Sequence, residues 1–287
     1  MAPPKASIII SVYNEFPRLQ KVLAGLERQT KQDFEIVFSD DGSNEDTVTA
    51  LQKYAESSKV PTQHIWHEDN GFRKTIILNK SIQAAKSDLL IFLDADCVPH
   101  PKYVEEHFAH RAPNTVVTGR RVHLSPKLTE WLTLDRIKSG ALEKPWFTLK
   151  IFANSLNGTK QAEKAIYKRN LPFNNLLKEK YKGILGSNWS VNKKDLFEIN
   201  GFDERYLAPA AGEDTDPQFR FAFAGKKVIP IGYHALQYHL YHKQQPRPQI
   251  NKDIMQTVID AGKPWTEYGI KQNEEAKAYL KTLSPTK

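Results

Sequence analysis

The chain has 287 residues, of which 40% are hydrophobic and 26% charged, and its formal net charge at pH 7 is +8. This length and composition suit one large domain or two small ones with a sizeable core. The single cysteine, Cys97, excludes an internal disulfide framework and favours a reducing compartment, and no stretch approaches the roughly 20 apolar residues needed to cross a bilayer.

Strand and helix patterns alternate along the first 120 residues. Short β-branched or apolar runs predict buried strands, and apolar residues at helical spacing predict helices between them. The predicted strands are 7–12, 34–38, 60–66, 88–93 and 115–118, and the predicted helices are 16–26, 44–54, 72–85 and 101–110. This alternation predicts right-handed βαβ units around a parallel sheet.

The pattern changes after residue 122. Residues 124–180 carry Leu, Trp and Phe between lysines, which indicates a basic helical insertion. Beyond it, strands are predicted at 184–191 and 228–232, helices at 195–200 and 213–224, and helical stretches in a polar tail at 251–280. We therefore divide the chain into an α/β half (1–122), a basic helical insertion (123–182), a second half of the same domain (183–245) and a helical C-terminal tail (246–287).

Two aspartates follow the fourth predicted strand. Asp94 and Asp96 come directly after the apolar run 89–93. On an extended backbone, residues two apart point to the same side, so both carboxylates could meet one hard cation through oxygen. The alternative is a solvated turn in which the aspartates cap backbone amides. The strand-end position favours the cation, because open α/β sheets bind ligands at the carboxyl ends of their strands.

A second acidic cluster, Asp40-Asp41-Gly42-Ser43, ends another predicted strand. A carboxylate there could accept a hydrogen bond from a nucleotide base or a ribose hydroxyl. A tight turn followed by a helix N-cap explains Gly42 and Ser43 equally well.

Arg73 and Lys74 lie in the first turn of the predicted helix 72–85. Cations are disfavoured there by the helix dipole, so two together suggest a contact with phosphate. A surface pair without a partner is the alternative.

Glu213 and Asp214 open the predicted helix 213–224, where the helix dipole also favours acids without any function. A functional carboxylate there would remove a proton from a hydroxyl nucleophile. His239 and His242 follow a predicted strand and a turn, and an imidazole from either could join the same cation as the aspartates.

Together these motifs resemble the inverting family 2 glycosyltransferases with the GT-A fold, over most of the chain. The resemblance implies a Rossmann-like, mainly parallel twisted sheet flanked by helices, with nucleotide-sugar binding in 1–122. Asp41 matches the uracil-reading aspartate, and Asp94-Ala95-Asp96 matches the metal-binding DxD motif. The full set of implied nucleotide-sugar contacts is Ser11, Tyr13, Asn14, Asp41, Arg73, Asp94, Gly186 and Asn188.

Gly212-Glu213-Asp214 resembles a C-terminal module of galactosyl- and N-acetylhexosaminyl-transferases. The resemblance assigns acceptor binding to Glu213 and Asp214 and makes Asp214 the catalytic base. It makes His239 a metal ligand beside Asp94 and Asp96, with His242 less securely matched. The module usually reads Trp-Gly-Gly-Glu-Asp, whereas here alanines stand at 210 and 211, so the tryptophan that stacks on the acceptor sugar is absent.

The implied reaction is a metal-dependent, inverting transfer of a hexose or N-acetylhexosamine from a UDP-sugar. Asp214 would deprotonate the acceptor hydroxyl, and a cation would balance charge on the diphosphate leaving group. Mixed oxygen and imidazole ligation suits Mn²⁺ somewhat better than Mg²⁺. The acceptor would be a glycan or a lipid-linked intermediate of bacterial surface polysaccharide or lipopolysaccharide synthesis.

The positive charge is concentrated in residues 120–194, which hold 16 Lys and Arg against 5 Asp and Glu, a net charge of +11. Such a region favours an anionic partner, although a solvated helical face would carry the same charge. With Trp131, Trp146 and Phe147 between the lysines, we expect the insertion to capture the acceptor and to contact an anionic membrane peripherally.

Residues 8–12 form only a short apolar run, followed at once by charges, unlike a signal peptide. We therefore expect a cytoplasmic protein, peripheral at the inner face of the cell membrane.

Three rival functions remain open. A nucleotidyltransferase would share the sheet and the metal carboxylates but attack phosphorus. A nucleic-acid-binding protein would use the basic region 120–194, although the chain lacks a recognised RNA or DNA module, and we expect no nucleic-acid partner. An inactive scaffold is disfavoured by the intact set of acids.

Overall fold

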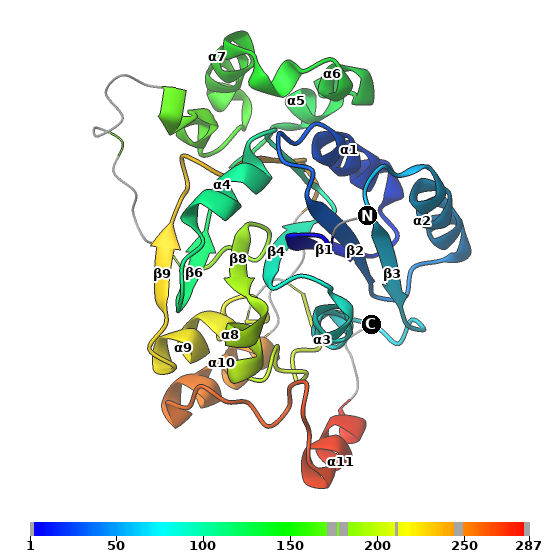
Figure 1. The fold of residues 1–287 in the computed structure, drawn as a ribbon, viewed down its shortest axis with the longest axis vertical. Coiled ribbons are helices and arrows are strands. Elements are labelled where there is room, and N and C mark those ends of the chain that lie inside the picture. Colours follow the sequence, from blue (N-terminus) through cyan, green and yellow to red (C-terminus); the bar gives the residue numbers. More distant parts are fainter. Residues whose placement is uncertain (1–2, 171–176, 178–182, 210–211, 244–248, 284–287) are drawn as a thin grey trace.

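The computed structural model describes residues 3–170, 177, 183–209, 212–243 and 249–283. A seven-stranded sheet in the order β3-β2-β1-β4-β8-β6-β9 forms its centre (Figure 1). The strands β3, β2, β1 and β4 are parallel, β8 is antiparallel to both its neighbours, and β9 is parallel to β6. The bounds are β1 Ala6–Val12, β2 Phe34–Asp40, β3 Thr62–Trp66, β4 Leu89–Asp94, β6 Thr115–Thr118, β8 Trp189–Asn192 and β9 Lys227–Pro230. The mainly parallel α/β sheet predicted from the sequence is thus confirmed.

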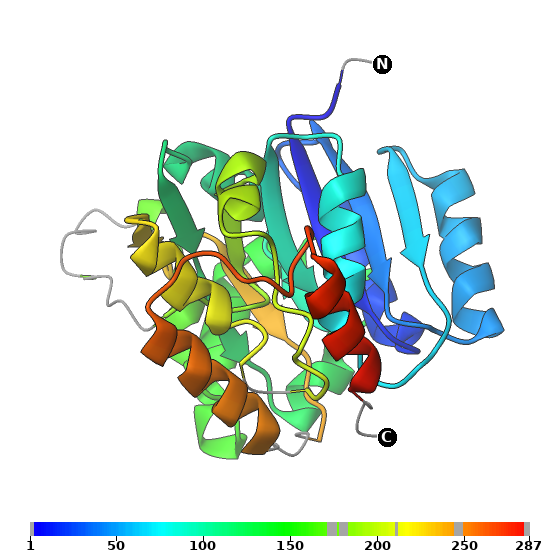
Figure 2. The same cartoon turned by 90° about the horizontal axis from the view of Figure 1, so that it is seen from below.

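Both faces of the sheet are buried, as expected for parallel strands rich in Ile, Leu, Val and Phe. Along β1, Ile8 and Ile10 belong to one core, with side chains of α1, α2 and α4, whereas Ile9 belongs to a second core with α3, α8 and α9. Figure 2 shows the strands of this sheet side by side, with the cyan helix α3 lying across them. The bounds are α1 Phe16–Glu27, α2 Glu45–Ser57, α3 Lys74–Ala84, α4 Tyr103–His110, α8 Lys193–Glu198 and α9 Asp216–Phe223.

A second sheet of three short strands, in the order β5-β10-β7, lies beyond the carboxyl end of β4. Its strands are β5 Cys97–Pro99, β7 Arg120–His123 and β10 Leu236–His239. In the antiparallel pair β10–β5, His239 lies opposite Cys97. This sheet therefore brings the end of the chain's second half beside the Asp94–Cys97 turn.

The basic insertion is a group of short helices, at the top of Figure 1. Phe147 and Ile151 of α7 are buried in the first core, so the insertion is anchored to the rest of the domain. Ser125 caps α5 through the Leu128 amide. The helices are α5 Pro126–Trp131, α6 Leu134–Lys138 and α7 Pro145–Ala153, with 3-10 turns η1 Ala141–Glu143, η2 Ser155–Asn157, η3 Ala162–Ala165 and η4 Lys168–Asn170. Residues 171–176 and 178–182 of the predicted insertion lie outside the described residues.

The C-terminal tail holds two helices, α10 Gln249–Ala261 and α11 Glu274–Thr282. α10 packs against α9. Residues 244–248 and 284–287, which include parts of the predicted tail, lie outside the described residues. Among the helices that are described, none is both long enough and apolar enough to cross a membrane.

Several local predictions were wrong. The predicted strand 184–191 is a strand only from Trp189, and it runs antiparallel to β4. The helix predicted from residue 213 begins at Asp216, with Pro217 in its first turn, so Glu213 and Asp214 stand in the turn before it. His239 does not follow a strand and a turn but is the last residue of β10.

Candidate active site

The predicted nucleotide-binding residues begin where three parallel strands end side by side. Ser11 of β1 pairs with Ser39 of β2 on one side and with Asp94 of β4 on the other. Because parallel strands end at the same edge, the register itself brings the residues that follow β1, β2 and β4 to one crevice.

Asn14 joins the loop after β1 to the loop after β2. It adopts the left-handed conformation (φ 52°), which asparagine tolerates better than most residues. Its amide donates to Ser43 Oγ at 2.9 Å, and its Oδ1 accepts from the Asn44 amide at 2.7 Å. Tyr13 beside it is 50% exposed, with its hydroxyl 3.1 Å from Asp69 Oδ2. The ring of Tyr13 is therefore open to a ligand.

Asp41 is buried and ties the loop after β2 to the loop between β3 and α3. Its Oδ1 lies 2.8 Å from His67 Nε2, and its Oδ2 accepts a hydrogen bond from the Arg73 amide at 2.9 Å. The turn that carries it needs glycine, because Gly42 has φ +89° and a Cβ there would lie 2.5 Å from Asp69 Cα. Asp41 is thus held in place before any ligand binds. A nucleotide base would have to share the carboxylate oxygens of Asp41 with these partners.

The two cations predicted for the start of α3 have different surroundings. Arg73 precedes the helix, and its guanidinium donates to the Leu283 carbonyl at 3.3 Å. Lys74 Nζ lies 3.5 Å from Asp94 Oδ1 and 3.7 Å from Glu213 Oε1. Burial opposes the charge of Lys74, but Asp94, Glu213 and Asp214 outweigh burial and raise its pKa. The resemblance pointed to Arg73 alone, although the cation pair in the first helical turn was a signal for Lys74 as well.

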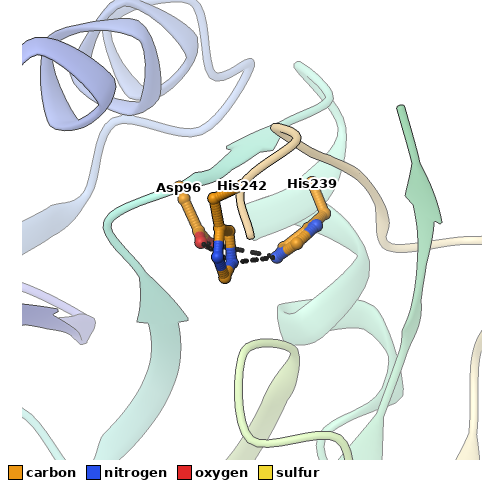
Figure 3. A group of neighbouring side chains, drawn as sticks. All are labelled: Asp96, His239 and His242. Carbon is orange, nitrogen blue, oxygen red and sulfur yellow. Dashed lines mark hydrogen bonds and ion pairs between the residues drawn. The ribbon is translucent and has the colours of Figure 1, made fainter. Parts of the chain in front are cut away.

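Asp96, His239 and His242 converge on one point (Figure 3). Asp96 Oδ2 lies 3.4 Å from His239 Nε2 and 3.1 Å from His242 Nε2, and the two imidazole nitrogens are 3.2 Å apart. Burial opposes ionisation of Asp96, but hydrogen bonds from both histidines outweigh it and hold the pKa of Asp96 well below its usual range. His242, matched less securely by the sequence, lies as close to Asp96 as His239 does.

Asp94 stands next to this group. Ligand atoms of Asp94, Asp96 and Cys97 lie within 4.8 Å of one another. Asp94 Oδ2 lies 3.8 Å from Arg121 Nη1, and that guanidinium also donates to Ser187 Oγ at 3.1 Å. Arg121 is a residue that sequence reasoning missed, because nothing in its local pattern shows that its side chain reaches Asp94 at the end of β4.

Glu213 and Asp214 face the same crevice from the turn before α9. Glu213 is buried, and its Oε2 has no hydrogen-bond partner. Burial raises the pKa of Glu213 to about 7, although the charge of Lys74 opposes this. Asp214 is partly exposed, and its Oδ1 accepts a hydrogen bond from the Thr215 hydroxyl at 3.1 Å. Alanines 210 and 211, which replace the module's usual residues, lie outside the described residues.

Gly186 and Asn188, both predicted to contact the donor sugar, differ in position. A Cβ at Gly186 would lie 2.7 Å from Asp214 Oδ2, so glycine lets the chain pass close to this carboxylate. Asn188 is fully buried, and its amide donates to the carbonyls of Arg120 and Ala235. Its Oδ1 lies 3.1 Å from His107 Nε2. The polar atoms of Asn188 are thus already used inside the protein, and its direct contact with the donor sugar stays a prediction.

The model of the family described as glycosyl transferase family 2 matches residues 7–171 of the chain. The chain belongs to this family. Among curated relatives, validoxylamine A glucosyltransferase of Streptomyces hygroscopicus subsp. jinggangensis is 35% identical over 121 residues, which cover 40% of this chain and 28% of that protein. Chondroitin synthase of Escherichia coli is 27% identical over 222 residues, which cover 75% of this chain and 32% of that protein. The chain thus spans about a third or less of these relatives' length.

Solved structures share the fold of this family 2 chain. The mannosyltransferase PcManGT from Pyrobaculum calidifontis, in complex with GDP-Man and Mn²⁺, has a TM-score of 0.54 at 15% identity, with 90% of this chain and 70% of that chain covered. Residues 1–349 of TarS from S. aureus, in complex with UDP, have a TM-score of 0.56 at 15% identity, with 90% and 65% covered. The expected GT-A fold is thus confirmed.

Proposed function

We propose that this chain transfers a sugar, a hexose or N-acetylhexosamine, from a UDP-sugar to a hydroxyl of a glycan or lipid-linked acceptor, with inversion. The observation that carries this proposal is the convergence of Asp94, Asp96, His239, Lys74 and Asp214 on one crevice, from elements far apart in the chain. Relatives named as a glucosyltransferase and a chondroitin synthase support glycosyl transfer.

A divalent cation, Mn²⁺ or Mg²⁺, fits the group formed by Asp96, His239 and His242. Their ligand atoms are 3.1 to 3.4 Å apart, and ligands bound at about 2.1 Å in octahedral or tetrahedral arrangements lie about 3.0 to 3.4 Å apart. Asp94 is the further carboxylate near this group. The bound ion would offset negative charge on the diphosphate leaving group.

Side chains of the protein add positive charge at the leaving group. Lys74 and Arg121 both lie beside Asp94, so a diphosphate at this carboxylate would meet two cations held in place by ion pairs. Groups that are fixed before the reaction stabilise developing charge without reorganisation. The backbone amide of Arg73 donates a hydrogen bond to Asp41, and Lys74 follows it in the chain. Arg73 would therefore lie between the nucleobase at Asp41 and the diphosphate at Lys74.

Asp214 is the proposed base. It is partly exposed, unlike Glu213, and can therefore reach an acceptor hydroxyl and take its proton as the oxygen attacks the anomeric carbon. Glu213, buried beside it with one free oxygen, would bind a second acceptor hydroxyl. Because residue 186 is glycine, the main chain can pass beside Asp214 without a clash with its carboxylate.

We further propose that the insertion contacts an anionic membrane that carries the acceptor. Four apolar side chains of α7 and the following turn are exposed: Trp146 47%, Leu149 68%, Phe152 40% and Leu156 95%. The first three recur every three residues and share one face of α7, and Leu156 follows in η2. All four lie within the region of net charge +11. Phe147 takes no part, contrary to the sequence prediction, because it is fully buried in the core.

Nucleotide release in the presence of Mn²⁺, measured across a set of UDP-sugars and GDP-mannose with a glycan acceptor, tests the transfer reaction. We expect release of free UDP with one of the UDP-sugars. In a parallel reaction with UTP and a sugar 1-phosphate, release of pyrophosphate would instead show a nucleotidyltransferase. For the membrane contact, flotation with vesicles of phosphatidylglycerol should recover the chain, and a Leu149→Glu/Leu156→Glu variant should not float. Equal flotation with neutral phosphatidylcholine would contradict the anionic preference.

A further inference from the structure

A second group of ligand-type side chains lies between α4 and the turn that leads into β10. Glu106 and His110 are four residues apart on α4 and therefore share one helix face. His234 reaches them from the turn before β10. One carboxylate oxygen and one nitrogen of each imidazole lie within 4.8 Å of one another. None of these residues takes part in the proposed transfer reaction.

The Glu106 carboxylate is fully buried, yet only one of its oxygens has a close partner. Oε1 accepts a hydrogen bond from the Tyr167 hydroxyl at 2.5 Å and pairs with Arg169 Nε at 2.7 Å. Oε2 and His234 Nδ1 are also buried, and they form only a long ion pair with each other, at 3.5 Å, without a hydrogen bond of normal geometry. Because buried polar atoms almost always have a partner, these two facing atoms indicate a ligand that both would share.

The separations match a tetrahedral metal site better than a hydrogen-bonded cluster. Glu106 Oε2 lies 3.5 Å from His110 Nδ1 and 3.5 Å from His234 Nδ1. Ligand atoms bound tetrahedrally at about 2.1 Å lie about 3.4 Å apart, whereas a direct hydrogen bond brings its atoms to about 2.9 Å. His110 Nδ1 also lies 2.9 Å from the Glu106 carbonyl oxygen, a contact that an ion would replace.

We propose that Glu106, His110 and His234 form a site for a divalent metal ion of the zinc class, separate from the Asp96 group. Two imidazoles and one carboxylate are a ligand set that Zn²⁺ accepts, with a fourth position for water. Tyr167 and Arg169 hold the other oxygen of Glu106 and so fix the direction of Oε2, as outer contacts do in metal sites. The ion would join α4 to the turn before β10.

Zinc binding by the full chain tests this proposal in a His239→Gln/His242→Gln background, which removes the imidazoles of the first group. After chelation and dialysis, calorimetric titration with Zn²⁺ should give one site per chain. Titration with Co²⁺ should give the visible absorption of a tetrahedral ion. Adding His234→Gln or Glu106→Gln should weaken Zn²⁺ binding at least tenfold and abolish that absorption.

His64→Gln in the same background is the matched control. His64 also pairs with a buried carboxylate, Asp40, but at the hydrogen-bond distance of 2.8 Å, and its removal should leave Zn²⁺ binding unchanged. The proposal is overturned if the background protein binds no Zn²⁺, or if His234→Gln binds it equally well. Should the added variants not fold, thermal unfolding of the background protein decides: its Tm should rise with Zn²⁺, and an unchanged Tm refutes the site.

Discussion

Lys74, the first residue of α3, lies 3.7 Å from the carboxylate of Glu213, which precedes α9. Two opposite sides of the crevice are therefore joined by one ion pair. The attraction is incomplete, because burial still raises the pKa of Glu213 to about 7. This carboxyl group thus titrates near neutral pH, unlike an exposed glutamate.

The raised pKa of Glu213 predicts how stability depends on pH. The folded chain holds this proton more tightly than the unfolded chain, where the ordinary pKa is 4.5. The contribution of Glu213 is therefore most favourable below about pH 4.5 and declines as pH rises to about 7, by up to about 3 kcal/mol. Urea unfolding of the wild type and Glu213→Gln across this range checks it. The variant should lose less stability with rising pH, and parallel curves would contradict the prediction.

Removal of the Lys74 charge should slow transfer. Lys74→Met keeps the length of the side chain but leaves Asp94 and Glu213 without their cation, and we expect kcat/KM for the UDP-sugar to fall roughly 10²-fold. Lys277→Met, an exposed lysine of α11 paired with Glu274, is the control and should keep full activity. Equal activity of the two variants would show that Lys74 does not contribute to transfer.

The base assignment predicts a large loss for Asp214→Asn. Loss of proton transfer should lower the rate of single-turnover transfer by about 10² to 10⁴, while binding of UDP changes little. Rapid mixing with a saturating donor, followed by product quantification, measures the step. Asp46→Asn, in the exposed first turn of α2, should react like the wild type. Substantial single-turnover transfer by Asp214→Asn would show that another group takes the proton.

If the proposed cation binds to Asp96, His239 and His242, both histidines should contribute to its affinity. His239→Gln and His242→Gln should each weaken Mn²⁺ binding at least tenfold, because each removes a ligand atom about 3 Å from its neighbours. Titration with Mn²⁺, followed by electron paramagnetic resonance of the free ion, gives the affinities. His123→Gln, next to His239 but outside the group, is the control. Unchanged affinity in His242→Gln would exclude His242 and leave Asp94, Asp96 and His239 as the proposed ligands.

Asn188 should matter for stability rather than for sugar binding. Asn188→Ala removes the two buried hydrogen bonds that its amide donates to the carbonyls of Arg120 and Ala235, at a cost of about 3 kcal/mol in the free energy of unfolding. Chemical denaturation measures the loss, and the KM of the folded variant for the donor should change less than threefold. A stable variant with a strongly raised KM for the donor would instead indicate that Asn188 contacts the donor sugar.

Much of the fold was predictable because long apolar strands carry their own signal. β1, β2 and β4 each contain a run of three or more apolar residues, and each run is followed by at least one polar residue near the end of the strand. The strands β5, β7 and β10 have only three or four residues, and their pairing depends on partners distant in the chain. No local pattern predicts them, which is why Arg121 was missed.

The sequence does contain a signal for the start of α9. Proline is favoured in the first turn of a helix, and Pro217 stands there, one residue after Asp216. The environment of Asn188 could not be predicted, since it depends on β7, β8 and the turn before β10 meeting around one amide. Glu106 gave no signal either, because its partners come from α4, the insertion and that same turn.

The three-stranded sheet determines how the crevice would receive the proposed cation. His239 lies opposite Cys97 in the β10–β5 pair, and the Leu240 amide donates to the Asp96 carbonyl at 2.8 Å. Main-chain hydrogen bonds therefore set the spacing between the side chains of Asp96 and His239 without the help of an ion. A chain stripped by chelation should keep the same arrangement, so that one metal can exchange for another without refolding the domain.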